Sequence, residues 1–196
     1  MSFHPPRNLT ARWRPAGGEG LEHLDLRPAD GTIVADGVVI GDRGGVPYGV
    51  RYRLVCDEDW ATRSLDLETT DGRSLHLRSD GDGEWTDAEG WPIPHLDGCI
   101  DIDLAGSPFT NTLPIRRSPD LLTSGAAAAF RMAYIPFDTF RPTVDAQRYR
   151  CLEPGRLYRY EAVDRSFAAD LPVDEDGLVA DYPGLFTRIQ LRGPTP

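Results

Sequence analysis

Hydrophobic and polar residues alternate with a period of two in several short segments of the chain. In segment 50–55, the apolar residues share one side and two arginines share the other. The same alternation recurs in segments 64–68, 74–78 and 98–104. This pattern is typical of strands in an antiparallel sheet that is covered on one face only.

Turn signals separate these segments. Asp-Gly between alternating segments favours a hairpin, and Pro-Gly also marks turns. Such pairs stand at Asp30-Gly31, Asp36-Gly37, Asp71-Gly72, Pro154-Gly155 and Asp176-Gly177. The 17 prolines and 20 glycines disfavour long helices, and only a short helix near 119–128 is expected. The pattern therefore predicts a mainly β protein with a long meander of antiparallel strands.

No linker or internal repeat divides the sequence. We therefore expect a single β domain over residues 1–196, with its core at about 9–192 and frayed ends at 1–8 and 193–196. No segment approaches the roughly 20 consecutive apolar residues of a membrane-spanning helix, so stable membrane insertion is not expected.

The net charge of −10 argues against some partners. Binding of nucleic acid depends on basic residues that release counterions from phosphates, so no nucleic-acid partner is expected. Electrostatic docking on an anionic membrane is disfavoured for the same reason. All 21 basic residues are arginines, which excludes mechanisms that use a lysine nucleophile.

The three cysteines, Cys56, Cys99 and Cys151, are far apart in sequence and odd in number. They match neither a zinc ribbon nor a disulfide framework, and free thiols in a reducing compartment are expected. The first residues contain no apolar run that would indicate a secretory signal. We therefore expect a cytoplasmic protein.

The most unusual stretch is 95–117, which opens with Asp97, Asp101 and Asp103. On a strand, Asp101 and Asp103 point the same way, roughly 6.5–7 Å apart. That spacing suits an inverting glycosidase pair or a hard metal ion such as Mg²⁺. Contact with a polar ligand is another alternative. The simplest is pairing with arginines across the sheet, at Arg51, Arg53 or Arg63.

Segment 107–117 follows, and its prolines predict an extended loop. The hydroxyl and amide groups at Thr110 and Asn111 can bond sugar hydroxyls, and Arg116 can bind a carboxylate or phosphate. The simpler interpretation of segment 107–117 is an ordinary turn without a role in binding. Tyr160, with the other tyrosines near the end of the chain, is expected to pack its ring in the core.

His23 is a candidate general base, because acids lie close to it in sequence. It alternates with Glu22 and Leu24 along segment 21–26, so it points away from their face. A structural role is the simpler interpretation of His23.

The chain resembles the bacterial putative glycolipid-binding family. The residues that carry the resemblance run over about 12–190. They are LDGCIDIDL at 96–104, PFTNTLPIR at 108–116, GLEH at 20–23, YRLVCD at 52–57 with Trp60 and Arg63, YRYE at 158–161 and DYPGLF at 181–186. The resemblance implies a fold like the curled sheets of lipid-carrier lipoproteins, namely a strongly curved antiparallel half-barrel or β-roll with an apolar concavity.

The leading hypothesis is a non-enzymatic binding protein for a glycolipid or similar amphiphile, with its tail in the sheet concavity and its head near 107–117. The candidate ligand-binding residues are Asp101, Asp103, Thr110, Asn111, Arg116, Tyr160 and Arg63. No catalytic set, metal site or cofactor is expected.

Two alternatives remain open. One is a sugar-directed hydrolase or isomerase that uses Asp97, Asp101, Asp103 and His23, which requires these groups to converge in one pocket. The other is a structural or regulatory module that forms a homo-oligomer through an exposed sheet face.

Overall fold

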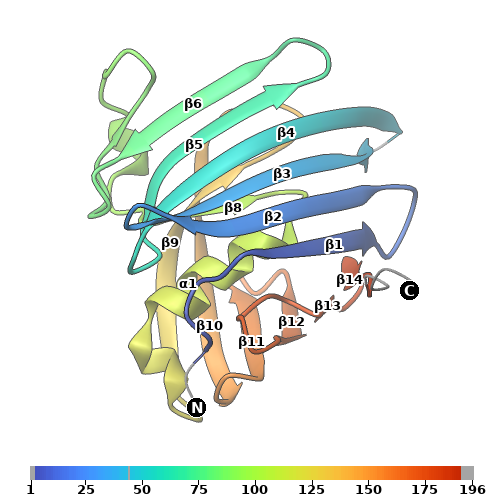
Figure 1. The fold of residues 1–196 in the computed structure, drawn as a ribbon, viewed down its shortest axis with the longest axis vertical. Coiled ribbons are helices and arrows are strands. Elements are labelled where there is room, and N and C mark those ends of the chain that lie inside the picture. Colours follow the sequence, from blue (N-terminus) through green and yellow to red (C-terminus); the bar gives the residue numbers. More distant parts are fainter. Residues whose placement is uncertain (1–2, 44, 191–196) are drawn as a thin grey trace.

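The protein is described by a computed structural model that covers residues 3–43 and 45–190. It is 53% strand and 8% helix, and a strongly curled half-barrel sheet dominates it (Figure 1). The expected mainly β fold with a curved sheet is therefore confirmed. The strands lie in two sheets of different size.

The larger sheet has nine strands, and every neighbouring pair in it is antiparallel. In spatial order they are β13 (Asp181–Tyr182), β14 (Phe186–Arg188), β1 (Leu9–Pro15), β2 (Leu21–Ala29), β3 (Thr32–Arg43), β4 (Val46–Asp57), β5 (Thr62–Thr69), β6 (Ser74–Ser79) and β7 (Trp85–Thr86). From β1 to β7 each strand pairs with the next along the chain. The expected meander is thus confirmed for this part.

The smaller sheet has five strands. They are β12 (Ala168–Pro172), β11 (Leu157–Ala162), β10 (Thr143–Glu153), β9 (Ala127–Ile135) and β8 (Asp101–Leu104). The pair β8–β9 is parallel, against the expectation of antiparallel strands. A parallel pair needs a long crossover between its strands, and residues 105–126 supply it.

That crossover is helical. It contains the 3₁₀ helix η2 (Pro108–Asn111), the helix α1 (Thr112–Arg117) and the 3₁₀ helix η3 (Pro119–Leu122). A further 3₁₀ helix, η1 (Pro94–Leu96), precedes β8. The predicted extended loop at 107–117 was therefore wrong. The short helix expected near 119–128 is present as η3, which is shorter than that range because β9 already begins at Ala127. The prolines misled because proline fits the first turn of a helix, where its missing N–H costs nothing.

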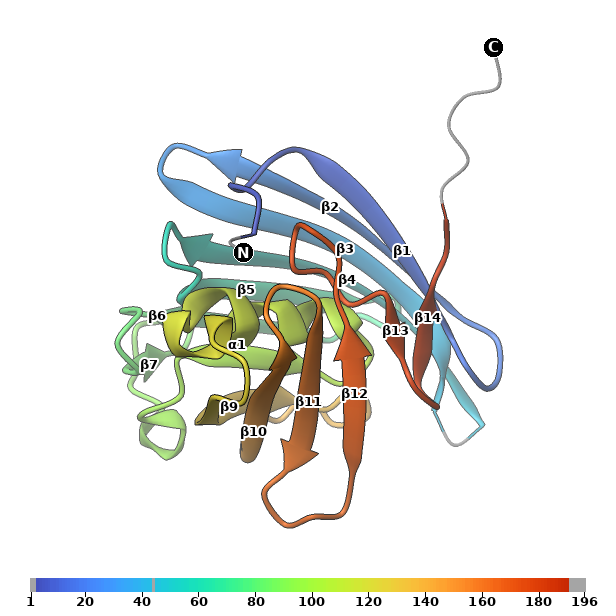
Figure 2. The ribbon, with the colours of Figure 1, turned by 90° about the horizontal axis from the view of Figure 1, so that it is seen from below.

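The two sheets face each other with the crossover helices between them (Figure 2). Leu24, Leu54 and Leu65 of the large sheet are fully buried in one core cluster with Leu104 of β8 and Leu113 of α1. The concave face of the half-barrel is thus largely filled by the protein's own side chains.

The alternation predicted in the large sheet is confirmed in β4, where Tyr52 and Leu54 are buried and Arg51 and Arg53 are exposed. It was wrong in β8. There Asp101 is buried together with Ile102 and Leu104, because protein covers both faces of that strand.

Asp36-Gly37 is not a turn, since both residues lie within β3. The turn at Asp30-Gly31 between β2 and β3 is confirmed, and both its residues have positive φ.

In the residues that the structure describes, the amino-terminal segment is hydrogen-bonded to the loop between β12 and β13. The His4 amide donates to the Glu175 carbonyl at 2.8 Å, and Arg7 donates twice to the Asp176 carboxylate. Residues 193–196 lie outside the described residues.

Candidate functional site

Glu22 is the most deeply buried of the acids that line a pocket of the structure. It lies on β2, on the same face as Leu24 and Leu26, and is only 2% exposed. Its Oε1 accepts hydrogen bonds from the Tyr52 hydroxyl at 2.7 Å and the Ser107 hydroxyl at 2.5 Å. Its Oε2 is equally buried and has no hydrogen-bond partner. A buried acceptor without a donor is costly, and such atoms are rare in folded proteins.

Burial raises the pKa of Glu22 from its ordinary 4.5 to about 7, although the Ser107 and Tyr52 hydroxyls oppose the shift. Removing the carboxylate from water disfavours its charged form, and no cation lies close enough to compensate. Near neutral pH, both the protonated and the charged form of Glu22 are therefore accessible. It can accept a hydrogen bond as a carboxylate or donate one as an acid.

Gly37 makes room for the Tyr52 ring. The two residues are cross-strand partners in the β3–β4 ladder. A Cβ atom at position 37 would lie 2.2 Å from Cζ of Tyr52, far closer than any packed contact. The absence of a side chain at Gly37 lets the phenol lie flat over β3 and reach Glu22.

Asp103 is the second acid with a strongly raised pKa. Its Oδ2 accepts from the Gln147 amide at 2.6 Å, and its Oδ1 accepts from the Thr110 hydroxyl at 3.3 Å. Burial raises its pKa to about 6, and the negative charge of Asp145 adds to the shift. The Gln147 amide also donates to Asp145, at 2.9 Å, so that one neutral group bridges two acids.

Two adjacent pockets open beside these acids. The first encloses about 420 Å³ and is walled by β2, β3 and the turns after β1 and β8. The second encloses about 370 Å³ and is walled mainly by β8, β10, β11 and η2. Both volumes are in the range of small-molecule sites.

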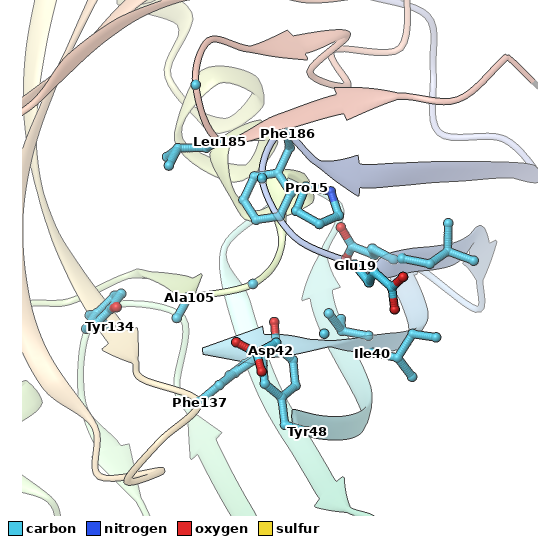
Figure 3. A pocket seen from close by; sticks show the side chains of 17 residues that line it. Pro15, Glu19, Ile40, Asp42, Tyr48, Ala105, Tyr134, Phe137, Leu185 and Phe186 are labelled. Carbon is cyan, nitrogen blue, oxygen red and sulfur yellow. The ribbon is translucent and has the colours of Figure 1, made fainter. Parts of the chain in front are cut away.

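Four residues, Ala105, Tyr134, Leu185 and Phe186, line both pockets. The pockets therefore form one continuous depression between the two sheets, which we call the intersheet groove. Figure 3 shows its first pocket, with Leu185 and Phe186 on one side and Phe137 on the other. Glu22 lies in the first pocket, and its partner Ser107 lines the second, so Glu22 stands near their junction.

The charge of the groove is one-sided. Among the residues that the structure describes, no arginine or histidine lines either pocket, whereas six acids do. These groove carboxylates are Glu19, Glu22, Asp42, Asp103, Asp145 and Asp164. Within the described part of the chain none of the six forms an ion pair, although acids elsewhere, such as Asp66, Asp101 and Asp176, pair with arginine.

Three of the residues predicted to bind a ligand line the groove, namely Asp103, Asn111 and Tyr160. The Asn111 side-chain oxygen accepts from the Tyr149 hydroxyl at 2.8 Å. Tyr160 packs edge-on against Tyr149 and Tyr182, and burial raises its pKa.

The other four predicted residues lie outside the lining of the groove. Asp101 makes a two-pronged ion pair with Arg117, at 3.0 and 2.7 Å, and not with the arginines expected across the sheet. Thr110 is buried behind Asp103. The remaining two, Arg116 and Arg63, donate to backbone carbonyls, and Arg116 also stacks over two aromatic rings.

The acids proposed for a hydrolase do not meet in the groove. Of Asp97, Asp101, Asp103 and His23, only Asp103 lines it. His23 accepts a hydrogen bond from Arg12 on the opposite face of β2 from Glu22. In the part that the structure describes, no three His, Cys, Asp or Glu side chains are grouped to hold a metal ion.

Glu22 was missed as a site residue by sequence reasoning. The available signal was an acid on the apolar face of an alternating strand, in line with Leu24 and Leu26. A charge at such a position is costly unless it is paired or has a role, so Glu22 is a better candidate than its half-buried neighbour His23.

Comparisons with known proteins agree with this architecture. A family described as "Putative glycolipid-binding" matches residues 10–188. A solved structure, described as that of a DUF1089 family protein from Pseudomonas aeruginosa, is 42% identical, with a TM-score of 0.76. The match covers 90% of this chain and 95% of that one. No curated protein matches the chain. Among the described residues, no helix is both long and apolar enough to cross a membrane.

Proposed function

The chain belongs to the putative glycolipid-binding family, and we propose that it is a non-enzymatic binding protein that holds a glycolipid or similar amphiphile in the intersheet groove. One observation carries the proposal. The first, more apolar pocket and the second, more polar pocket are joined through the lining residues that they share. An amphiphile needs such a site, with a continuous apolar surface that leads to clustered polar groups.

The first pocket suits the apolar tail. Val39, Ile40 and Phe137 line it, and Leu185 and Phe186 continue the apolar surface toward the second pocket. The concavity is largely filled by the core, so the proposed position of the tail is in the first pocket of the groove.

The second pocket suits the head group. Asp103, Asn111 and Ser107 offer carboxylate, amide and hydroxyl groups from β8 and the crossover, so the head lies beside the start of segment 107–117. Sugar hydroxyls form hydrogen bonds with groups of these kinds. We place the protein in the cytoplasm, which the three buried free cysteines support.

Isothermal titration with octyl glucoside, below its critical micelle concentration, tests the proposal. Ala105 lies on the shared wall, and Ala105→Phe should block the groove and weaken binding at least tenfold. Ala129→Phe is the matched control, because Ala129 is exposed on β9 and lines neither pocket. Thermal unfolding verifies that both variants are folded.

Saturable binding that is lost in Ala105→Phe and kept in Ala129→Phe is the expected result. Undiminished binding by Ala105→Phe, or no binding by the wild-type protein, would overturn the proposal. Native mass spectrometry of the purified protein should also reveal a bound amphiphile.

A further inference from the structure

We propose, resting on the proposed function, that the head group recognised in the intersheet groove carries a protonated amine, as in an amino-sugar amphiphile. Charge complementarity is the first argument. The six groove carboxylates line the same depression, and no arginine or histidine is among the described residues that line it. In a partly desolvated site, like charges without counterions are unfavourable, and a cationic ligand relieves that repulsion.

The second argument is the unpartnered oxygen of Glu22. Both protein donors that reach this carboxyl, Tyr52 and Ser107, bond to Oε1. Oε2 is left as a buried acceptor on a side chain that lines the first pocket. An ammonium group is a donor without acceptor character, and it can supply both the missing hydrogen bond and the missing counter-charge.

The aromatic rings of the second pocket are the third argument. Tyr160, Phe167 and Tyr182 all line it, and their ring centroids are 6.0–6.1 Å from one another. Such clusters of ring faces attract cations through the ring quadrupole, and ammonium ligands are commonly bound this way. Asp103 lies in the same pocket and adds a carboxylate to the rings.

An anionic head group has no comparable partner here. Arg117 is held by Asp101, and Arg116 is held by the carbonyls of His4 and Asp176. Neither guanidinium lines the groove. A phosphate or carboxylate placed in the groove would meet six acids of its own sign and, among the described lining residues, no cationic side chain.

Three probes with alkyl tails of similar length separate the possibilities. They are octyl glucoside, its 2-amino-2-deoxy counterpart octyl glucosaminide, and octanoate, each titrated calorimetrically below its critical micelle concentration. We expect the glucosaminide to bind at least tenfold more tightly than the glucoside, and octanoate to bind most weakly. The first two probes differ only by an amine in place of one hydroxyl.

Glu22→Gln and Asp103→Asn should each reduce this preference at least threefold, because each removes a carboxylate and keeps a neutral side chain of similar shape. Asp170→Asn is the control, because Asp170 is on β12, half exposed and outside the groove lining. It should keep the full preference. Two groove variants are used so that the test survives if one of them fails to fold.

Equal affinities for glucoside and glucosaminide would overturn the amine inference and leave the proposed function standing. If octanoate binds most tightly of the three probes, the amine inference is also overturned and the proposed function still stands. If none of the three probes binds to the wild-type protein, both the inference and the proposed function fall.

Discussion

Asp101 and Asp103 stand two residues apart on the same strand, yet they lie in opposite electrostatic environments. Asp101 is fully buried and receives two hydrogen bonds from Arg117. Asp103 receives only neutral donors, from Gln147 and Thr110, and lines the intersheet groove. The comparison teaches that a buried acid with an arginine partner belongs to the fold. An acid left without one is available to a ligand.

Glu22, on the larger sheet, is also an acid without an arginine partner. Like Asp103, it is bonded by neutral donors, has a raised pKa and lies beside the groove. The groove is therefore built from acids of both sheets whose charge the protein itself does not neutralise.

The largest effect is expected where the arginine partner is removed. Arg117→Met leaves Asp101 buried without its counter-charge, which should lower the free energy of unfolding by about 3–5 kcal/mol. Denaturant unfolding measures the loss. The control is Arg159→Met, which breaks a pair that is 46% exposed on both sides and should cost less than about 1 kcal/mol. Similar losses in the two variants would contradict the buried-pair account.

Glu22→Gln should change how stability depends on pH. The unfolded chain releases the Glu22 proton near pH 4.5, whereas the folded protein keeps it until about pH 7. Between these values the folded state binds more protons, so wild-type stability falls as pH rises, by about 3 kcal/mol from this group.

Glutamine imitates the protonated acid and carries no such dependence. Relative to the wild type, Glu22→Gln should therefore gain stability between pH 4.5 and 8, in urea titrations at fixed pH. A constant difference across that range would show that Glu22 is not buried as described.

Gly37→Ala tests the packing that brings Tyr52 to Glu22. The added methyl group overlaps the Tyr52 ring and should cost about 1–3 kcal/mol in unfolding free energy. Gly17→Ala is the control, because nothing lies within 4 Å of a Cβ at that position. Its effect should stay within about 0.5 kcal/mol. Equal stability of the two variants would rule out the close Gly37–Tyr52 contact.

The smallest effect on stability is expected at Asp103. Asparagine keeps an acceptor for Gln147 and removes a carboxylate whose charge is disfavoured, so Asp103→Asn should alter stability by less than about 1 kcal/mol. Thermal unfolding at pH 7 measures this. A loss as large as that of Arg117→Met would place Asp103 with Asp101 as part of the fold.

Much of the fold followed from local patterns. Strict alternation around Tyr52 and Leu54 predicted a half-covered strand, because side chains on a strand point alternately to opposite faces. Asp30-Gly31 predicted its turn because both residues take the positive φ that the turn requires. Gly37 was misjudged as part of a turn, since its role is to leave space for a ring on the neighbouring strand.

The candidate site was harder to predict from the sequence, because the environment of each acid depends on residues that are distant in sequence. Nothing near Asp101 indicated Arg117, which the helical crossover carries back to β8. Nothing near Glu22 indicated Ser107, 85 positions away. Spacing on one strand made Asp101 and Asp103 look alike, and only the placement of the second sheet separates them.

A crystal structure of the protein with octyl glucosaminide tests the central claim most directly. The account predicts the octyl chain along Val39 and Phe186 and the amine nitrogen about 3 Å from Oε2 of Glu22. An amphiphile bound elsewhere, with the intersheet groove free of it, would contradict the account.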